Sequence, residues 1–309
     1  MLASEHFVTR ASVRIGVVAD DVETEASAEV RTALGAEKAR VPACKARVGS
    51  PVWRAITSPH ALIHQTPHIN RAYHKLHEIS LSCALPRTVA RSVHLCEAPG
   101  GFVACTADHL ATDGWQWRAV TLADGIAPSN DPRMPNARGA FLLTDVTARD
   151  PHEVAADLVS ALGGAPVDLV TADGASEMDH VALEEQHFEL FAAQCRVAMR
   201  CLATGGVFVI KFFEGLLART RRVIAWLSTH FRQVSIIKPT SSRATNSERY
   251  LVCRERTSGP DDDDPTAYDR VMVSAQWDAE LDHCLARLAW QQVRSLRDTM
   301  TALGERKTG

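Results

Sequence analysis

The chain has 309 residues, of which 46% are hydrophobic and 23% are charged, so it is long enough to bury one substantial core. Its formal net charge of −3 excludes the general basic coat that carries non-specific nucleic-acid binding, so any RNA contact has to come from a local basic patch. Its eight cysteines form no CxxC pair and show no Cys/His spacing of a structural zinc site, which indicates reduced thiols and predicts no metal site.

The N-terminal region, residues 1–60, carries no recognisable motif. It contains a strand-like run at Val13–Ala19 and a helical stretch near Glu23–Ala36, so we predict an extension whose role the sequence does not define. No segment near Met1 reads as a signal peptide, and no apolar run is long enough to span a membrane. We therefore expect a soluble intracellular protein without a membrane partner, in the nucleus or in the cytoplasm, including that of a virus-infected cell.

From about residue 92 onward, short runs rich in β-branched residues alternate with longer helical patterns, which is typical of a parallel α/β sheet. A helix is predicted at Val181–Leu202, with Gly205 and Gly206 as its C-terminal stop. The seven predicted strands are Ser92–Cys96, Arg118–Leu122, Phe141–Leu143, Val167–Ala172, Val207–Phe212, Val234–Lys238 and Tyr250–Cys253.

The C-terminal region, residues 258–309, begins with an acidic linker at Ser258–Pro265, whose four aspartates are typical of a solvated spacer rather than a metal site. An amphipathic helix is predicted over Val273–Leu303. Such a stripe usually packs on its own domain and more rarely binds a partner or a second copy, so the oligomeric state stays open. The apolar stripe consists of Trp277, Leu281, Leu285, Leu288, Leu296, Met300 and Leu303.

The segment His94–Phe102 ends the first predicted strand in a Pro-Gly-Gly turn and opens a helix at about Val103–Leu110. Glycines at such a turn let the backbone approach a ligand at the carboxyl edge of the sheet, where open α/β folds bind cofactors. Taken alone, the turn is equally compatible with an ordinary strand-to-helix connection. It lacks the GxGxxG spacing, which makes a dinucleotide the less favoured ligand.

Glu97–Phe102 resembles the cofactor motif of FtsJ-like ribose methyltransferases, and the chain repeats the family's other motifs in the same order, over about residues 68–254. The wording Asp173-Gly174-Ala175 and the segment from Trp115 to Leu122 are more similar to enzymes acting on the mRNA cap, whereas rRNA enzymes tend to carry Met-Ala-Pro after that aspartate. The other matching segments are Arg71–Ile79, Thr171–Ala175, Val209–Phe213, Lys238–Arg243 and Asn246–Tyr250.

The resemblance implies an α/β, Rossmann-like methyltransferase domain at residues 61–257, with a seven-stranded, mostly parallel sheet and helices on both faces. It implies S-adenosylmethionine as the cofactor and RNA, most simply 5'-capped mRNA, as the partner. The implied catalytic residues are Lys75, Asp173, Lys211 and Glu248. The implied cofactor-binding residues are Glu97, Ala98, Pro99, Gly100, Gly101, Phe102, Asp124, Asp145 and Asp173. RNA binding is expected of the basic and hydroxyl-bearing loop with Lys238, Ser241, Ser242 and Arg243.

The four catalytic residue types suit methyl transfer to a ribose 2'-hydroxyl. This hydroxyl is a poor nucleophile, so an enzyme has to hold it in line with the methyl group and help its proton leave. A neighbouring ammonium and partial desolvation favour a neutral lysine, whereas carboxylates oppose this and orient the ammonium groups. We expect Lys211 to deprotonate or orient the hydroxyl. A plain ion pair of Lys211 with Glu248 is the structural alternative.

The remaining candidates have structural alternatives as well. Asp145 resembles the family's adenine-binding residue but also suits a helix N-cap or a turn, and Asp124 suits a turn equally well. The Lys238 loop could be a simple polar turn. Two further sets are weaker candidates: Arg219, Arg221 and Arg222 as an RNA guide or a solvated helix face, and Trp53, Trp115 and Trp117 for stacking on a cap base.

Three functions are therefore compared. The first is a cap-directed mRNA 2'-O-methyltransferase, and the second is an rRNA or tRNA 2'-O-methyltransferase of the same family. The third is a catalytically silent scaffold that binds cofactor or RNA, although a scaffold has no need of the complete set of lysines and carboxylates.

Overall fold

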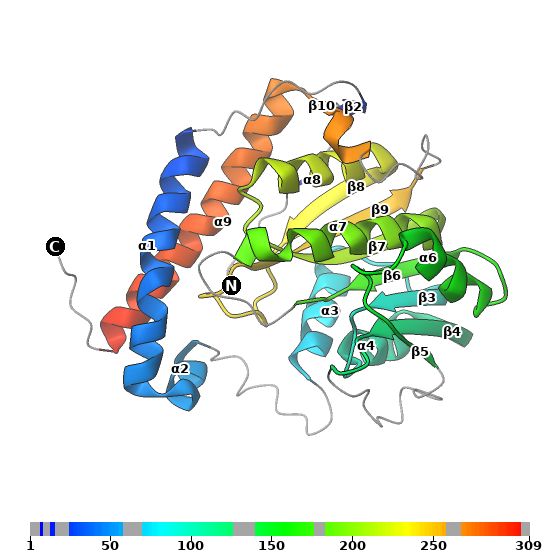
Figure 1. Cartoon of the computed structure of the whole chain (residues 1–309), viewed down its shortest axis with the longest axis horizontal. Coiled ribbons are helices and arrows are strands. Elements are labelled where there is room, and N and C mark those ends of the chain that lie inside the picture. The colour runs from blue at the N-terminus through cyan, green and yellow to red at the C-terminus, as the bar shows by residue number, and fades with distance from the viewer. Residues whose placement is uncertain are drawn as a thin grey trace.

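The computed structural model describes residues 7–8, 13–15, 25–57, 70–125, 140–175, 183–257 and 267–303. One eight-stranded sheet runs through the molecule (Figure 1), in the order β1-β8-β9-β7-β6-β3-β4-β5. Its strands are β1 Phe7–Val8, β3 Val89–Leu95, β4 Ala111–Thr121, β5 Phe141–Leu143, β6 Val167–Ala172, β7 Leu202–Phe213, β8 Phe231–Ile237 and β9 Glu248–Arg256.

All seven predicted strands are present, with β1 added at one edge. The neighbouring pairs from β5 through β4, β3 and β6 to β7 are parallel, whereas β9 runs antiparallel to both of its neighbours, β7 and β8. The predicted mostly parallel α/β sheet is confirmed. The carboxyl ends of β3, β6 and β7 consequently meet at one edge, and the start of the reversed strand β9 joins them there.

Helices cover both faces of this sheet (Figure 1). The helices α6 (Pro151–Ser160), α7 (Leu183–Cys201) and α8 (Ala218–His230) lie on one face, and α3 (Arg71–Ser82) and α4 (Gly101–His109) on the other. Alternate residues of one strand belong to the two cores, because successive side chains of a strand point to opposite faces. In β7, for example, Phe208, Ile210 and Phe212 pack with α7 and α8, whereas Val207 and Val209 pack with α3 and α4.

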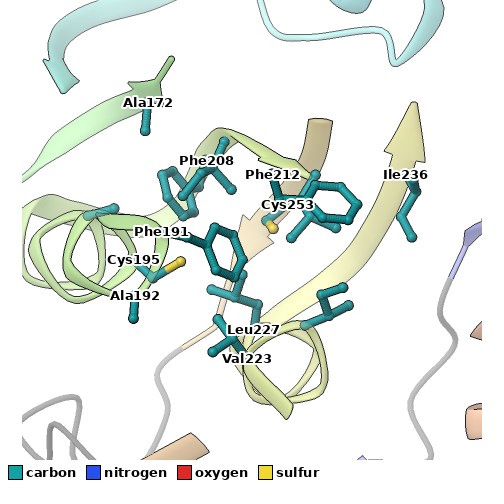
Figure 2. Close-up of a cluster of buried hydrophobic side chains, with 14 of the residues drawn as sticks. Ala172, Phe191, Ala192, Cys195, Phe208, Phe212, Val223, Leu227, Ile236 and Cys253 are labelled. Atoms are coloured by element: carbon teal, nitrogen blue, oxygen red, sulfur yellow. The ribbon is translucent and has the colours of Figure 1, made fainter. Parts of the chain in front are cut away.

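Figure 2 shows the first of these cores, in which Phe191 of α7 and the strand residues Phe208 and Phe212 lie between Ala172 and the α8 residues Val223 and Leu227. The rings of Phe191 and Phe212 are 6.3 Å apart between centroids. Tight packing of such side chains fixes the ends of β6 and β7 with respect to each other, which a precise site at their carboxyl edge requires.

The predicted glycine stop of the long helix is wrong. Helix α7 ends at Cys201, and Leu202 already belongs to β7. The pairing with β6 moves from Val167↔Leu202 to Leu169↔Val207, so the residues between them form a bulge in the strand. Gly205 has a φ of 82° within this bulge, where a side chain would be strained. The two glycines therefore belong to the bulge near the start of β7 and do not cap the helix.

The two ends of the chain form one helical layer. Helix α1 (Glu25–Val48), followed by α2 (Ser50–Thr57), lies beside α9 (Ala275–Ala302) in Figure 1. Leu34 of α1 and Leu285 and Val293 of α9 are buried in the same core as α7 and α8. The prediction that the tail helix packs on its own domain is thereby confirmed. The described helices of the predicted regions 1–60 and 258–309 thus share a core with the sheet domain.

Smaller elements also connect the two ends. Strand β2 (Val13–Ile15) pairs with β10 (Val271–Val273), which follows the 3-10 helix η2 (Ala267–Arg270). The expected linker Ser258–Pro265 and the second half of the expected strand Val13–Ala19 lie outside the described residues. Among the helices described, none combines the length and apolar character that crossing a membrane requires.

Candidate active site

Helix α3 is attached to the start of β9 and to the loop before it by three side chains spaced along one helix face. Arg71 donates to the backbone oxygen of Ser241 at 3.2 Å, and Lys75 lies 2.8 Å from the carboxylate of Glu248. Glu78 accepts hydrogen bonds from the backbone nitrogens of residues 240 and 241. The side chain of Asn70 caps the helix by accepting from two backbone nitrogens of its first turn. The matching segment Arg71–Ile79 therefore both carries Lys75 and holds the opposite loop.

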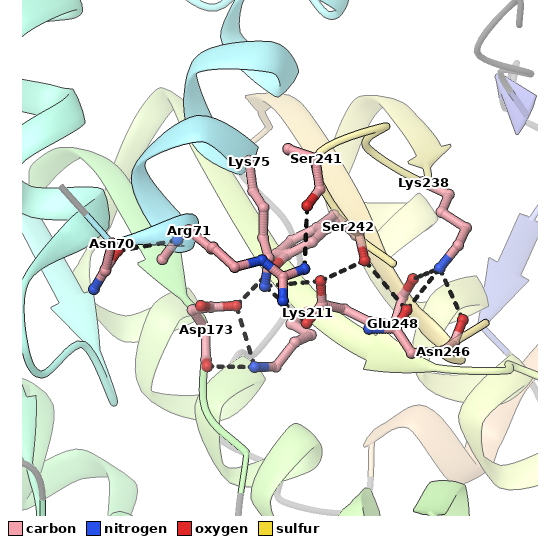
Figure 3. A network of polar contacts seen from close by, with 12 residues as sticks. Asn70, Arg71, Lys75, Asp173, Lys211, Lys238, Ser241, Ser242, Asn246 and Glu248 are labelled. Carbon is pink, nitrogen blue, oxygen red and sulfur yellow. Dashed lines mark hydrogen bonds and ion pairs between the residues drawn. The ribbon is translucent and has the colours of Figure 1, made fainter. Parts of the chain in front are cut away.

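The second lysine and carboxylate meet at the carboxyl edge of the sheet (Figure 3). Asp173 directly follows β6, and the Nζ atom of Lys211 lies 3.2 Å from its Oδ1 atom and 2.6 Å from its backbone oxygen. The hydroxyl of Tyr250 donates to the same Oδ1 atom at 2.7 Å. Tyr250 is the register partner of Lys211 across β7 and β9. Tertiary structure thus brings the four predicted catalytic side chains together as two neighbouring ion pairs.

The carboxylates control the charge of Lys75. Its burial lowers the pKa, but Asp173 and Glu248 together raise the pKa above its usual value. Burial alone would raise the pKa of Glu248, yet Lys75, Lys211 and Lys238 lower it to about 2. The sequence left open whether lysine repulsion or carboxylate attraction prevails. For Lys75 the carboxylates prevail, so its ammonium stays protonated and Glu248 stays ionised at neutral pH.

The loop predicted to bind RNA turns two of its residues inward. The Nζ atom of Lys238 donates to the side-chain and backbone oxygens of Asn246 at 2.8 Å and to the backbone oxygen of Glu248 at 2.9 Å. The buried hydroxyl of Ser242 donates to Glu248 at 2.8 Å. These contacts give Lys238 and Ser242 a supporting place behind Glu248. Ser241, bonded to Glu78, and Arg243 are half-buried, and RNA contact by this loop stays a prediction.

Burial lowers the pKa of Lys238 to about 7, and the cations Arg249 and Lys75 also lower it, while Glu248 raises it. Lys238 is thus a weaker cation than a surface lysine, which makes it less suited to binding phosphate. A supporting role behind Glu248 agrees with this environment.

The Pro-Gly-Gly turn joins β3 to α4 beside this site. Gly100 has a left-handed backbone, with φ at 114°, and an added Cβ atom on Gly101 would lie 2.0 Å from the Oδ1 atom of Asn70. Gly101 thus admits the N-terminus of α3, and the expected ligand contact of both glycines stays a prediction. Glu97 and Phe102 are buried, and the carboxylate of Glu97 accepts from the backbone nitrogen of Phe102. Both side chains therefore support the turn from inside.

Replacing Gly101 with alanine tests this packing. We expect the free energy of unfolding to fall by about 1–3 kcal/mol, because the new methyl group overlaps the cap of α3. Gly35→Ala in α1 is the matched control: its Cβ atom meets open space, and removing a helical glycine stabilises by up to about 1 kcal/mol. Urea unfolding of both variants measures the difference. Equal effects in the two variants would contradict the close approach of α3.

The groups at the carboxyl ends of β3, β4 and β5 fit a nucleoside ligand. The acidic residues Asp124 and Asp145 are exposed there, and so are the large apolar side chains Leu122 and Leu143, at 48% and 57%. In the turn after β3, Cys96 and the cis-linked pair Ala98 and Pro99 are half-buried. Apolar surface with a few acceptors is what a purine and a ribose require. These acceptors and apolar side chains therefore fit the adenosine part of S-adenosylmethionine.

Both exposed aspartates also lie in turns, which is the structural role that the sequence offered as the alternative to cofactor binding. Asp145 accepts from the backbone nitrogen and the hydroxyl of Thr147 through its Oδ1 atom, at 2.8 and 2.7 Å. Asp124 lies in a turn closed by a bond from the backbone nitrogen of Gly125 to the backbone oxygen of Leu122. Turn geometry and a cofactor contact are compatible, so the contact stays a prediction for both.

The tryptophans considered for cap stacking lie elsewhere. Trp53 and Trp117 are only 4% exposed. Trp115 stacks on Trp117 with ring centroids 5.9 Å apart and donates to Ser92. The carboxyl end of β4 faces the site. Trp115 precedes Trp117 along β4, so it lies farther from that end. None of the three is placed for stacking on a base at the site.

The arginines of α8 make contacts within the chain. Arg221 is buried and joins α8 to α9 through ion pairs with Asp278 and Asp282, at 2.6 and 2.7 Å. The guanidinium of Arg219 lies 4.3 Å from the ring centroid of Phe188, and Arg222 lies 3.9 Å from Asp269. Arg221 therefore joins two helices inside the protein, whereas the sequence suggested either an RNA guide or a solvated helix face. Within the described ranges, no group of three or more histidine, cysteine or acidic residues is arranged to hold a metal ion.

Sequence reasoning missed Tyr250 as a member of the site. It lies two residues after Glu248 in β9, and alternate residues of a strand share a face. That spacing was a usable signal. Asn70 and Ser242 gave no comparable signal, because their partners depend on how α3 and the loop are placed.

A family model for FtsJ-like methyltransferases matches residues 68–256, about three fifths of the chain. This chain belongs to the FtsJ-like methyltransferase family. The matched range contains both ion pairs and the Pro-Gly-Gly turn, whereas α1, α2 and α9 lie outside it.

Several relatives in this family are RNA methyltransferases by name. Cap-specific mRNA (nucleoside-2'-O-)-methyltransferase 2 of Drosophila melanogaster is 34% identical over 191 residues, covering 54% of this chain and 27% of the relative. The cap-specific enzyme of Autographa californica nuclear polyhedrosis virus is 28% identical, covering 62% of this chain and 73% of the relative. The human tRNA (cytidine(32)/guanosine(34)-2'-O)-methyltransferase is 28% identical, covering 60% of this chain and 53% of the relative. This chain thus spans about a quarter of the fly relative's length.

A solved structure of a putative ribosomal RNA methyltransferase from Plasmodium falciparum aligns with a TM-score of 0.48 at 19% identity. The alignment covers 60% of this chain and 97% of that chain.

Proposed function

We propose that this protein is an S-adenosylmethionine-dependent RNA 2'-O-ribose methyltransferase. The observation that carries the proposal is the meeting of the Lys75–Glu248 and Lys211–Asp173 ion pairs at the edge of the sheet where the Pro-Gly-Gly turn ends. Two lysines and two carboxylates at one partly buried place are costly to assemble. Such a set suits the positioning of a hydroxyl and the acceptance of its proton by a lysine. The family match and the named relatives support the same reaction class.

The four side chains take different roles in this proposal. Lys211 orients the 2'-hydroxyl and, when its Nζ atom carries no extra proton, accepts the proton of the hydroxyl there. Asp173 directs that Nζ atom and is itself held by the hydroxyl of Tyr250. Lys75 stays an ammonium, because its carboxylate neighbours raise its pKa, and it offers the incoming ribose a fixed positive charge. Glu248 holds Lys75 in place.

S-adenosylmethionine supplies the electrophilic methyl group when it is bound. The half-buried residues Cys96, Ala98 and Pro99 and the left-handed Gly100 would hold its amino-acid and ribose parts. Asp124 and Asp145 would accept from the ribose and the adenine, with Leu122 and Leu143 against the base.

We propose capped mRNA as the substrate class, on two grounds. Two of the relatives are named cap-specific mRNA methyltransferases, and the segment Asp173-Gly174-Ala175 is more similar to cap enzymes than to rRNA enzymes. A tRNA or rRNA substrate is the second candidate, favoured by the tRNA-modifying relative. The position of the tryptophans supports neither.

Transfer of a labelled methyl group to matched short RNAs, one capped and one with a 5'-triphosphate, separates the two substrates. We expect the capped RNA to be methylated at least about tenfold faster, since one good recognition contact contributes about 1–3 kcal/mol. Nuclease digestion then identifies the 2'-O-methylated nucleotide. Equal rates would contradict the cap, and no transfer to either of these RNAs or to tRNA would contradict the methyltransferase proposal.

A further inference from the structure

A second buried polar cluster lies directly behind the start of β9, and none of its members belongs to the two ion pairs of the site. Glu214, just after β7, forms a buried ion pair with Lys38 of α1. The hydroxyl of Ser247 donates to the carboxylate of Glu214 at 2.8 Å. The Nε2 atom of Gln292, on α9, donates to the same hydroxyl at 3.1 Å and to the backbone oxygen of Thr245 at 3.2 Å.

This cluster holds the chain on both sides of Glu248. Ser247 precedes Glu248 and bonds to Glu214 through its hydroxyl, while its backbone oxygen accepts from the backbone nitrogen of Glu214 at 3.3 Å. Arg249 follows Glu248 and donates from Nη1 to the backbone oxygen of Glu214. Phe213, next to Glu214, is the register partner of Glu248. The backbone position of Glu248 is therefore set by Glu214 and its partners.

The partners of Glu214 come from the ends of the chain. Lys38 and Gln292 are 4% and 2% exposed, so neither reaches solvent or a substrate. Both lie outside residues 68–256, the range that the family model matches. Packing alone does not call for such polar groups, because apolar side chains of similar volume usually stabilise a buried site as well or better.

We propose that the terminal helices α1 and α9 position Glu248 through Lys38, Glu214, Ser247 and Gln292, which act as positioning residues for methyl transfer. The proposal rests on the proposed function in one respect, the expected change of turnover. Its geometric content is the placement of the Glu248 carboxylate against Lys75. A displacement of that carboxylate frees the Lys75 ammonium, and errors of about 1 Å at a reacting site cost up to about 10²-fold in rate.

The variant Gln292→Leu tests this with little risk to folding, because it is uncharged, keeps the side-chain bulk and removes an oxygen, Oε1, that has no hydrogen-bond partner. We expect kcat to fall about tenfold, with the KM for RNA and the cofactor affinity within about twofold of the wild type. Lys38→Met should give a larger loss, since it leaves Glu214 without its cation. If Lys38→Met does not fold, Gln292→Leu decides alone.

The control variant Asp282→Asn lies in the same helical layer and also breaks a buried ion pair, that with Arg221. This ion pair joins α9 to α8 and includes none of residues 245–249. We expect it to lower the melting temperature at least as much as Gln292→Leu while kcat at low temperature stays unchanged. A loss of kcat that follows stability across all three variants would overturn the positioning role.

A second readout does not need turnover. The chain has only six lysines, so ¹³C-lysine labelling, with Lys75→Arg for assignment, allows the Lys75 side chain to be titrated by NMR. If Glu248 shifts in Gln292→Leu, the pKa of Lys75 falls, because one of the two carboxylates that raise it moves away. An unchanged pKa would overturn the inference even if the wild type methylates no RNA, an outcome that by itself counts only against the proposed function.

Discussion

Substituting Lys211 with alanine is expected to lower kcat about 10³-fold, because the variant loses the group that orients the 2'-hydroxyl and takes its proton. Cofactor affinity should stay within about threefold of the wild-type value, since the side chain of Lys211 bonds to Asp173, outside the Pro-Gly-Gly turn. Single-turnover methyl transfer measures the first quantity and isothermal titration calorimetry with S-adenosylmethionine the second.

Lys211→Arg is the informative partner of this variant. A guanidinium can keep the ion pair with Asp173, but its pKa is too high for it to accept a proton near neutral pH. We expect turnover to remain lost in both variants. Turnover that survives in Lys211→Arg would assign Lys211 a purely electrostatic role, and turnover that survives in Lys211→Ala would refute its place in the reaction.

Glu248→Gln is expected to lower both activity and stability, and the second effect depends on pH. The pKa of Glu248 is lowered from 4.5 to about 2 by Lys75, Lys211 and Lys238, despite the opposing effect of burial. A carboxylate with a lowered folded-state pKa stabilises the protein above its unfolded-state pKa, and this contribution is lost as the pH falls through about 2. The loss at neutral pH should be about 3 kcal/mol, and it should shrink below about pH 4.5.

Urea unfolding at pH 7 and at pH 3.5, with wild type and variant side by side, measures this dependence. Glu255→Gln, in the same strand, is the control: its 64% exposed side chain meets Arg232 only at 3.7 Å, and an exposed pair of this kind contributes less than about 1 kcal/mol. Methyl transfer by Glu248→Gln should fall about 10²-fold, since Lys75 loses the acceptor that holds it. An unchanged difference in stability between the two pH values would contradict an ionised Glu248 paired with Lys75.

The local sequence by itself determined the seven main strands and four of the eight described α-helices, namely α1, α4, α7 and α9. Apolar β-branched runs such as Val167–Ala172 are bounded by turn residues, and both ends of that strand were predicted correctly. Parallel strands place their carboxyl ends at one edge, so the positions of Asp173 and of the Pro-Gly-Gly turn followed from the strand order. The sequence motifs then predicted the FtsJ-like family, and the family match confirms this.

Only the tertiary structure decided which side chains meet and in what state of charge. Lys75 and Glu248 are 173 residues apart in the chain, and nothing local pairs them with each other instead of with Asp173 or Lys211. The loop with Lys238 and Ser242 looks like an exposed basic turn in the sequence. In the fold, the carboxylate and carbonyl oxygens of Glu248 draw both side chains inward.

The contacts of Gly101 and of the two chain ends could not be predicted from the sequence either. The glycine is required by the approach of Asn70 from α3, and Lys38 and Gln292 meet behind β9 from opposite ends of the chain. Hydrophobic periodicity and turn chemistry act between neighbours in the sequence, so they determine the elements. Contacts between elements depend on how their apolar faces pack, and this packing decided the support of the site and the charge of Lys75.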